Sequence, residues 1–134
     1  MIRQKTIGRS ISVKGIGLHS GQPTTLRMTP AAVGTGIVFL RNDLDRSVPI
    51  EARYDRVVDT RLCTCLGRDG VIVSTVEHLM AALYGLGVDN LMIDLDGPEI
   101  PILDGSSQGW VDHLLEAGLV EQRRARKVVV VRRP

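Results

Sequence analysis

The spacing of apolar residues changes near residue 75, and this change constrains the fold more than any other feature. Before it, short runs rich in β-branched residues alternate with glycine and proline, which is typical of strands and turns. After it, apolar residues fall at positions 76, 79, 80, 83 and 86, which is helical spacing. A second helical stripe begins after Ser106 or Ser107 and ends at Gly118. The chain therefore begins with strands and continues with strands and helices in alternation.

This order predicts an α+β fold, a two-layer sandwich in which two helices pack on one face of a mixed β-sheet. The segment "RLCTCLGRDGVIVS" predicts a hairpin that turns at residues 68–70. Gly87 is the expected C-terminal cap of the first helix. The second helix is expected to bury one stripe of side chains, and the valines at 128–131 are expected to form a final strand. The residues of that stripe are Trp110, Val111, Leu114 and Leu115.

The composition indicates a soluble, cytoplasmic protein. No run approaches the roughly 18 apolar residues that a membrane span needs, and the opening "MIRQKTIGRS" lacks the apolar core of a signal peptide. Aromatic residues make up only 3% of the chain, so the core is expected to be aliphatic. Cys63 and Cys65 are too close along one strand for an ordinary disulfide, which favours reduced thiols.

The basic residues are concentrated near the C-terminal end of the sequence. Residues 121–134 hold six of the 17 basic residues and one of the 15 acidic ones, which leaves 11 basic against 14 acidic elsewhere, a net charge of −3. A basic tail can bind nucleic acid, but no aromatic side chain for base stacking accompanies these charges. We therefore expect a solvated strand flank, with no nucleic-acid partner.

The helix that begins near residue 75 carries a face of small residues around His78. An exposed helix face normally carries charged or long polar side chains, whereas small side chains let another backbone approach closely. This face is expected to pack against the second helix or a partner outside the chain. Its residues are Ser74, Thr75, Ala81, Ala82 and Gly85.

The adjacent pair Glu77 and His78 allows two interpretations. Ser74 and Glu77 fit a capping box, in which Glu77 would do no more than cap its own helix. His78 would then be a hydrogen-bonded interfacial imidazole. Alternatively the pair is catalytic, although the sequence lacks the HExxH zinc motif and a catalytic zinc needs about three protein ligands.

Candidate partners for His78 are few. Cys63 and Cys65 could complete a three-ligand site if their strand lies beside the helix start, although small buried cysteines are common without any such role. His19 lies in the glycine-bounded loop "GIGLHSG", a favourable place for a functional side chain. His113, in the middle of the second helix, is expected to be structural or solvent-facing.

Taken together, five segments resemble the zinc-dependent UDP-3-O-acyl-N-acetylglucosamine deacetylase family of lipid A biosynthesis. The resemblance runs through nearly the whole chain in order, and the parts "TVEHLMAAL" and "PEIPILDGS", in the fourth and fifth segments, are long and specific. Members of that family are about twice this length and have two similar α+β domains, with the active site between them. The segments are "MIRQKTI", "GIGLHSG", "DTRLCTCLG", "STVEHLMAAL" and "GVDNLMIDLDGPEIPILDGSS".

The resemblance implies that Glu77 is the general base and His78 a zinc ligand. It also places His19, Thr60, Leu62 and Cys63 near the substrate. The other two zinc ligands, from an HKxxD motif absent here, would lie in a second domain, as would most of the groove for the acyl chain. The small face around His78 would be where the helices of that domain pack.

The resemblance also implies an organisation and a set of partners. Residues 1–120 would form the first domain, and residues 121–134 a terminal strand and the start of the connection to the second. The substrate would be UDP-3-O-acyl-N-acetylglucosamine, in the cytoplasm of a Gram-negative bacterium, and the chain alone would be inactive and could form a homo-oligomer through the helix face or terminal strand. The alternative is a non-catalytic binding module with the same fold.

Overall fold

A five-stranded mixed sheet forms the centre of the fold. The structure is a computed structural model that describes residues 1–133. The sheet order is β2-β3-β9-β4-β5, and only the β4–β9 pair is parallel. The strands of this sheet are β2 (Ile11–Ile16), β3 (Pro23–Pro30), β4 (Ile37–Arg41), β5 (Ile50–Glu51) and β9 (Leu91–Leu95).

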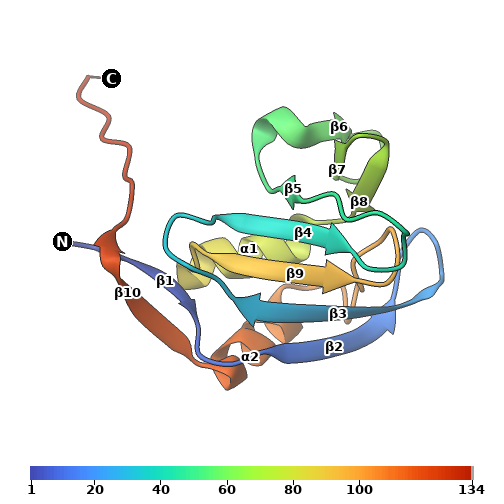
Figure 1. The fold of residues 1–134 in the computed structure, drawn as a ribbon, viewed down its shortest axis with the longest axis horizontal. Coiled ribbons are helices and arrows are strands. Elements are labelled where there is room, and N and C mark those ends of the chain that lie inside the picture. The colour runs from blue at the N-terminus through green and yellow to red at the C-terminus, as the bar shows by residue number, and fades with distance from the viewer. Residues whose placement is uncertain (134) are drawn as a thin grey trace.

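Both helices, α1 (Glu77–Leu86) and α2 (Gln108–Ala117), lie behind this sheet and contact each other (Figure 1). Leu79 and Leu83 of α1 are fully buried, as are Trp110 and Leu114 of α2, and they join the strand residues in one core. The predicted two-layer α+β sandwich is therefore confirmed. Leu115 was wrongly assigned to the buried stripe, since it is 54% exposed on the outer side of α2.

The small-residue face of α1 is only partly as predicted. Ala81 and Gly85 are exposed, but Ala82 is buried in the core, at 2% exposure. Ala82 therefore packs inside this chain and is not free for a partner outside it. Gly87 caps the helix as expected, with a φ of 72° that favours glycine, and its amide donates to the carbonyls of Leu83 and Tyr84.

A smaller sheet, β6-β7-β8, stands beside the main one (Figure 1). Its strands are β6 (Val57–Asp59), β7 (Cys65–Arg68) and β8 (Val71–Ser74), preceded by the short 3₁₀ helix η1 (Tyr54–Arg56). The predicted hairpin is β7–β8. Asp69 and Gly70 both have positive φ, 50° and 78°, as a tight hairpin turn with the strand twist requires.

The final strand is β10 (Leu119–Ala125), and the predicted strand at 128–131 is wrong. Gly118 turns the chain back immediately after α2, so that β10 pairs antiparallel with β1 (Arg3–Ile7). Arg126 then bonds to Asp89, with Nε 2.9 Å from Oδ1, and its amide donates to the Ile2 carbonyl. This contact ends the pairing, and the valines beyond it are exposed.

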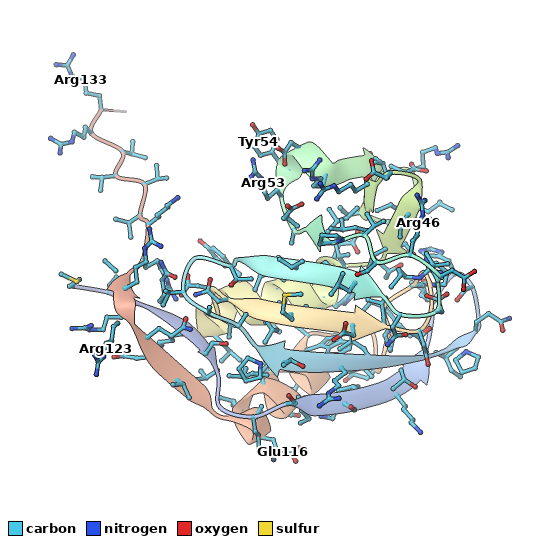
Figure 2. The ribbon with its side chains drawn as sticks, viewed as in Figure 1. Arg46, Arg53, Tyr54, Glu116, Arg123 and Arg133 are labelled. Carbon is cyan, nitrogen blue, oxygen red and sulfur yellow. The ribbon has the colours of Figure 1, made fainter. Side chains whose placement is uncertain are left out.

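The basic tail leaves the body of the molecule after Arg126, and Figure 2 shows Arg123 and Arg133 pointing away from the sheet. The residue 120 boundary of the predicted first domain falls within β10. Among residues 1–133, neither helix is long and apolar enough to cross a membrane.

Candidate active site

The start of α1 has an unusual backbone. Thr75, between β8 and the helix, adopts a φ of 59°, which is uncommon for a β-branched residue. Val76 is the N-cap residue, and no side chain caps the helix. The predicted capping box is therefore wrong: Ser74 belongs to β8 and its hydroxyl donates to the carbonyl of Pro98, 3.1 Å away. Glu77 is thus free of the capping role.

The Glu77 carboxylate instead bonds to the loop before β7, where it accepts a hydrogen bond from the backbone amide of Thr64. Partial burial raises the pKa of Glu77, but the bond from the Thr64 amide, with smaller contributions that include the nearby His78, outweighs it. The net pKa is lowered, so the carboxylate is ionised at neutral pH. An ionised carboxylate at the start of a helix is also favoured by the helix dipole.

His78 is half-buried beside two carboxylates. Its charged form helps to lower the pKa of both Glu77 and Asp104. Asp104 owes its lowered pKa first to the amide and hydroxyl of Ser106, which both donate to Oδ1. Asp104 was missed as a candidate, although it lies in the segment "PEIPILDGSS" that carried part of the resemblance.

A cavity of about 600 Å³ opens next to this helix start. Three of the predicted residues line it, namely His19, Leu62 and Cys63, whereas Thr60 does not. Leu62 is 84% exposed, which leaves its apolar side chain unpaired at the rim. The remaining lining residues are Asp59, Arg61, Cys65, Ile72 and Ser74.

The two cysteines are free, and their sulfur atoms lie 3.6 Å apart. Burial, with Cys63 alongside, raises the pKa of the Cys65 thiol to about 11. Cys65 is therefore protonated at neutral pH, and only a thiolate binds metal well. Within residues 1–133 no group of three His, Cys, Asp or Glu side chains could hold a metal ion, so a site made of His78 and both cysteines does not form.

A further residue that the sequence did not single out is Glu99. Its carboxylate is almost fully buried, at 2% exposure, and accepts hydrogen bonds from the amides of His19 and Ser20 and from the Thr75 hydroxyl. It thereby connects the His19 loop to the residue that precedes the α1 start. The available signal was a glutamate within the otherwise apolar stretch "PEIPIL".

The sequence matches the family model of UDP-3-O-acyl N-acetylglycosamine deacetylase over residues 4–134. The chain belongs to this family. Similar curated proteins carry the name UDP-3-O-acyl-N-acetylglucosamine deacetylase. The protein from Geobacter sp. (strain M21) is 52% identical over 134 residues, all of this chain. The protein from Histophilus somni is 50% identical over 135 aligned residues, and that from Myxococcus xanthus is 52% identical over 130.

The match covers a limited part of each of these deacetylases. The chain spans 44% of the length of the Geobacter and Histophilus proteins and 41% of the Myxococcus protein. The matched region is the N-terminal part of these relatives. The chain is therefore homologous to one portion of these deacetylases.

Proposed function

We propose that this chain is the N-terminal half of a zinc-dependent amidohydrolase that removes acetate from UDP-3-O-acyl-N-acetylglucosamine in lipid A biosynthesis. The observation that carries the proposal is the pair Glu77 and His78 at the start of α1, with Glu77 ionised and held beside a cavity lined by His19, Leu62 and Cys63. A binding module without chemistry has no need of a carboxylate and an imidazole in this arrangement.

The residues present fit part of a zinc site. His78 offers an imidazole, a ligand that zinc favours, and the carboxylate of Glu77 lies next to it in sequence. The two other protein ligands of a catalytic zinc would come from a second domain, which the resemblance expects to supply a histidine and an aspartate from an HKxxD motif. A bound zinc ion would lower the pKa of a water toward neutrality and polarise the acetamide carbonyl.

The residues of this chain have distinct tasks in the proposed reaction. Glu77 accepts a proton from the attacking water, for which its ionised state is required. His78 would be the ligand that this chain gives to the metal, at the start of the helix. His19, Leu62 and Cys63 contact the substrate along the cavity, and Thr60 lies near the site in the loop that carries Leu62 and Cys63. The water oxygen bonds to the acetamide carbon, the C–N bond breaks, and the proton that Glu77 took up passes to the leaving amine, so that acetate is released.

The same proposal implies a domain organisation, a set of partners and a compartment. Residues 1–120 form the first domain and 121–134 lead toward the second, whose helices cover the exposed small residues Ala81 and Gly85 of α1. The partners are the nucleotide-sugar substrate and the second domain, and the compartment is the bacterial cytoplasm. A homo-oligomer stays a prediction for the chain alone.

The first test is the reading frame beyond Pro134. We expect it to continue into a half that contains HKxxD, and the complete protein to release acetate from the substrate while residues 1–134 alone release none. A frame that ends without such a half, in a protein that releases no acetate, would favour the alternative of a non-catalytic binding module. His78→Ala in the complete protein should lower the zinc content measured by atomic absorption.

A further inference from the structure

Glu99 is a buried carboxylate whose partners are all neutral groups. Its Oε1 accepts from the His19 amide at 2.9 Å and from the Thr75 hydroxyl at 2.9 Å, and its Oε2 accepts from the Ser20 amide at 2.8 Å. A buried charge is costly unless it is fully hydrogen-bonded. Three donors from two distant segments are aimed at one side chain, so the charge is stabilised only when both segments are in place.

The backbone around Glu99 is held between the same two segments. On one side, the Ser74 amide donates to the Pro98 carbonyl at 2.8 Å, and the Ile100 amide donates to the Ser74 carbonyl at 3.1 Å. On the other side, the Ile102 amide donates to the Ile16 carbonyl at 3.0 Å. The segment at 98–102 thus bridges the end of β8 and the end of β2.

Gly17 allows this close approach. A Cβ atom at this position would lie 2.2 Å from Oε2 of Glu99 and 2.3 Å from the hydroxyl of Ser20. Only glycine leaves room for the carboxylate against the loop that carries His19. The His19 loop and the Glu99 side chain are therefore closely packed against each other.

Thr75 connects this carboxylate to the proposed catalytic residues. Its φ of 59° is strained for a β-branched residue, and such strain persists only where the surroundings enforce it. The hydrogen bond from its hydroxyl to Glu99 supplies that enforcement. Two residues later, Glu77 and His78 begin α1, so the conformation of Thr75 sets where both side chains enter the site.

We propose that Glu99 is a positioning residue that holds the His19 loop and the Glu77–His78 helix start in fixed relation across the active site. This inference rests on the proposed function for its catalytic consequence. A misplacement of about 1 Å at a reacting group can lower turnover roughly 10²-fold. The loss of Glu99 or of its bond to Thr75 should therefore lower kcat more than it raises KM, although neither residue contacts the substrate.

Replacement of Thr75 in the complete protein tests the inference. Thr75→Val removes the hydroxyl and keeps the shape, and we expect kcat to fall roughly 10-fold or more with little change in KM. Thr75→Ser restores the hydroxyl and should recover most of the loss. Glu99→Gln, which cannot accept bonds at both of its terminal atoms, should be more severe than Thr75→Val.

A matched control separates positioning from general instability. Thr6, on β1, is also buried, and its hydroxyl donates to the Asn90 carbonyl at 2.7 Å. It makes no hydrogen bond to Glu99, to the His19 loop or to the start of α1. Thr6→Val should lower the melting temperature and leave kcat unchanged at temperatures where the protein is folded. Equal kcat losses in Thr6→Val and Thr75→Val would overturn the inference.

Amide hydrogen exchange in the complete protein gives a readout that needs no activity. The amides of His19 and Ser20 should exchange slowly in the wild type and at least 10-fold faster in Glu99→Gln or Thr75→Val, but not in Thr6→Val. If the wild type releases no acetate, the proposed function fails while this comparison still decides the role of Glu99. A wild type that is active, with kcat and exchange unchanged in Thr75→Val, would contradict the inference alone.

Discussion

The carboxylate of Glu77 accepts a hydrogen bond from the backbone amide of Thr64, and it does not cap the helix that it begins. This bond joins α1 to the loop that carries Leu62 and Cys63, two residues that line the cavity. A side chain that could have stabilised its own helix is committed to a loop 13 residues earlier. Its position is therefore set by the loop that precedes β7 rather than by the helix end.

The buried Glu99 should make stability depend on pH. Burial raises its pKa, but hydrogen bonds from His19, Ser20 and Thr75 outweigh this and lower the pKa from 4.5 to about 2. A lowered folded pKa contributes stability that is fully present above pH 4.5 and is lost as the pH falls toward 2. The contribution is about 3 kcal/mol, at about 1.4 kcal/mol per pKa unit.

Urea unfolding of the chain at several pH values measures this contribution. The free energy of unfolding of the wild type should exceed that of Glu99→Gln by an amount that shrinks as the pH falls from 5 toward 2, because only the wild type loses the carboxylate contribution. A difference that stays constant over this range would show that the Glu99 charge is not stabilised by its neighbours.

Gly17→Ala should destabilise the chain by about 1–3 kcal/mol, because the new methyl group has no room against Glu99 and Ser20. Gly85→Ala is the matched control. It lies in α1 with open space around its Cβ position, and it should stabilise the helix by about 0.5–1 kcal/mol. Thermal unfolding followed by circular dichroism should show a lowered melting temperature for Gly17→Ala and a raised one for Gly85→Ala. Similar melting temperatures for the two variants would be the opposing result.

The helix face around His78 allows a test of self-association. Ala81 is exposed and Ala82 is buried. We predict a homodimer or larger oligomer of the isolated chain, and Ala81→Glu should weaken it without unfolding the protein. Ala82→Glu should destabilise the fold itself, because an unpaired charge enters the core. Light scattering that shows a monomer at high concentration, with no effect of Ala81→Glu, would contradict the predicted interface.

The spacing of apolar residues and the turn residues predicted both helices, the mixed sheet and the β7–β8 hairpin, since these depend on local patterns. It did not predict the helix start correctly, because the bond partners of Ser74, Thr75 and Glu77 lie 13 to 24 residues away. The valine run suggested a strand at 128–131, but a strand needs a neighbour. The free edge of β1 is filled by β10, to which Gly118 directs the chain immediately after α2.

The roles of the site residues stay a prediction. Glu77, His78, His19 and Cys63 were candidates from the residues themselves, and the resemblance assigned their roles and added Leu62 and Thr60. Glu99 has no visible signature beyond its apolar surroundings. Its importance depends on the convergence of β2, β8 and the 98–102 segment, which only the tertiary structure displays.

Zinc binding by residues 1–134 alone should be weak. His78 is one ligand, and the protonated Cys65 thiol is a poor one, so the site falls short of the three protein ligands that hold a catalytic zinc. Isothermal titration calorimetry checks this, with His78→Ala as the control that removes the remaining binding. One tightly bound zinc per chain, unaffected by Cys63→Ser, would mean that a complete site exists within this chain.

The most direct test of the account is the turnover of Glu77→Gln in the complete protein. The amide keeps the shape of the side chain and cannot accept a proton. We predict that acetate release falls roughly 10²–10⁴-fold, the usual contribution of a general base, while zinc content stays at the wild-type level. Near-normal acetate release by Glu77→Gln would show that Glu77 only holds the Thr64 loop, and would contradict the proposed role of this pair.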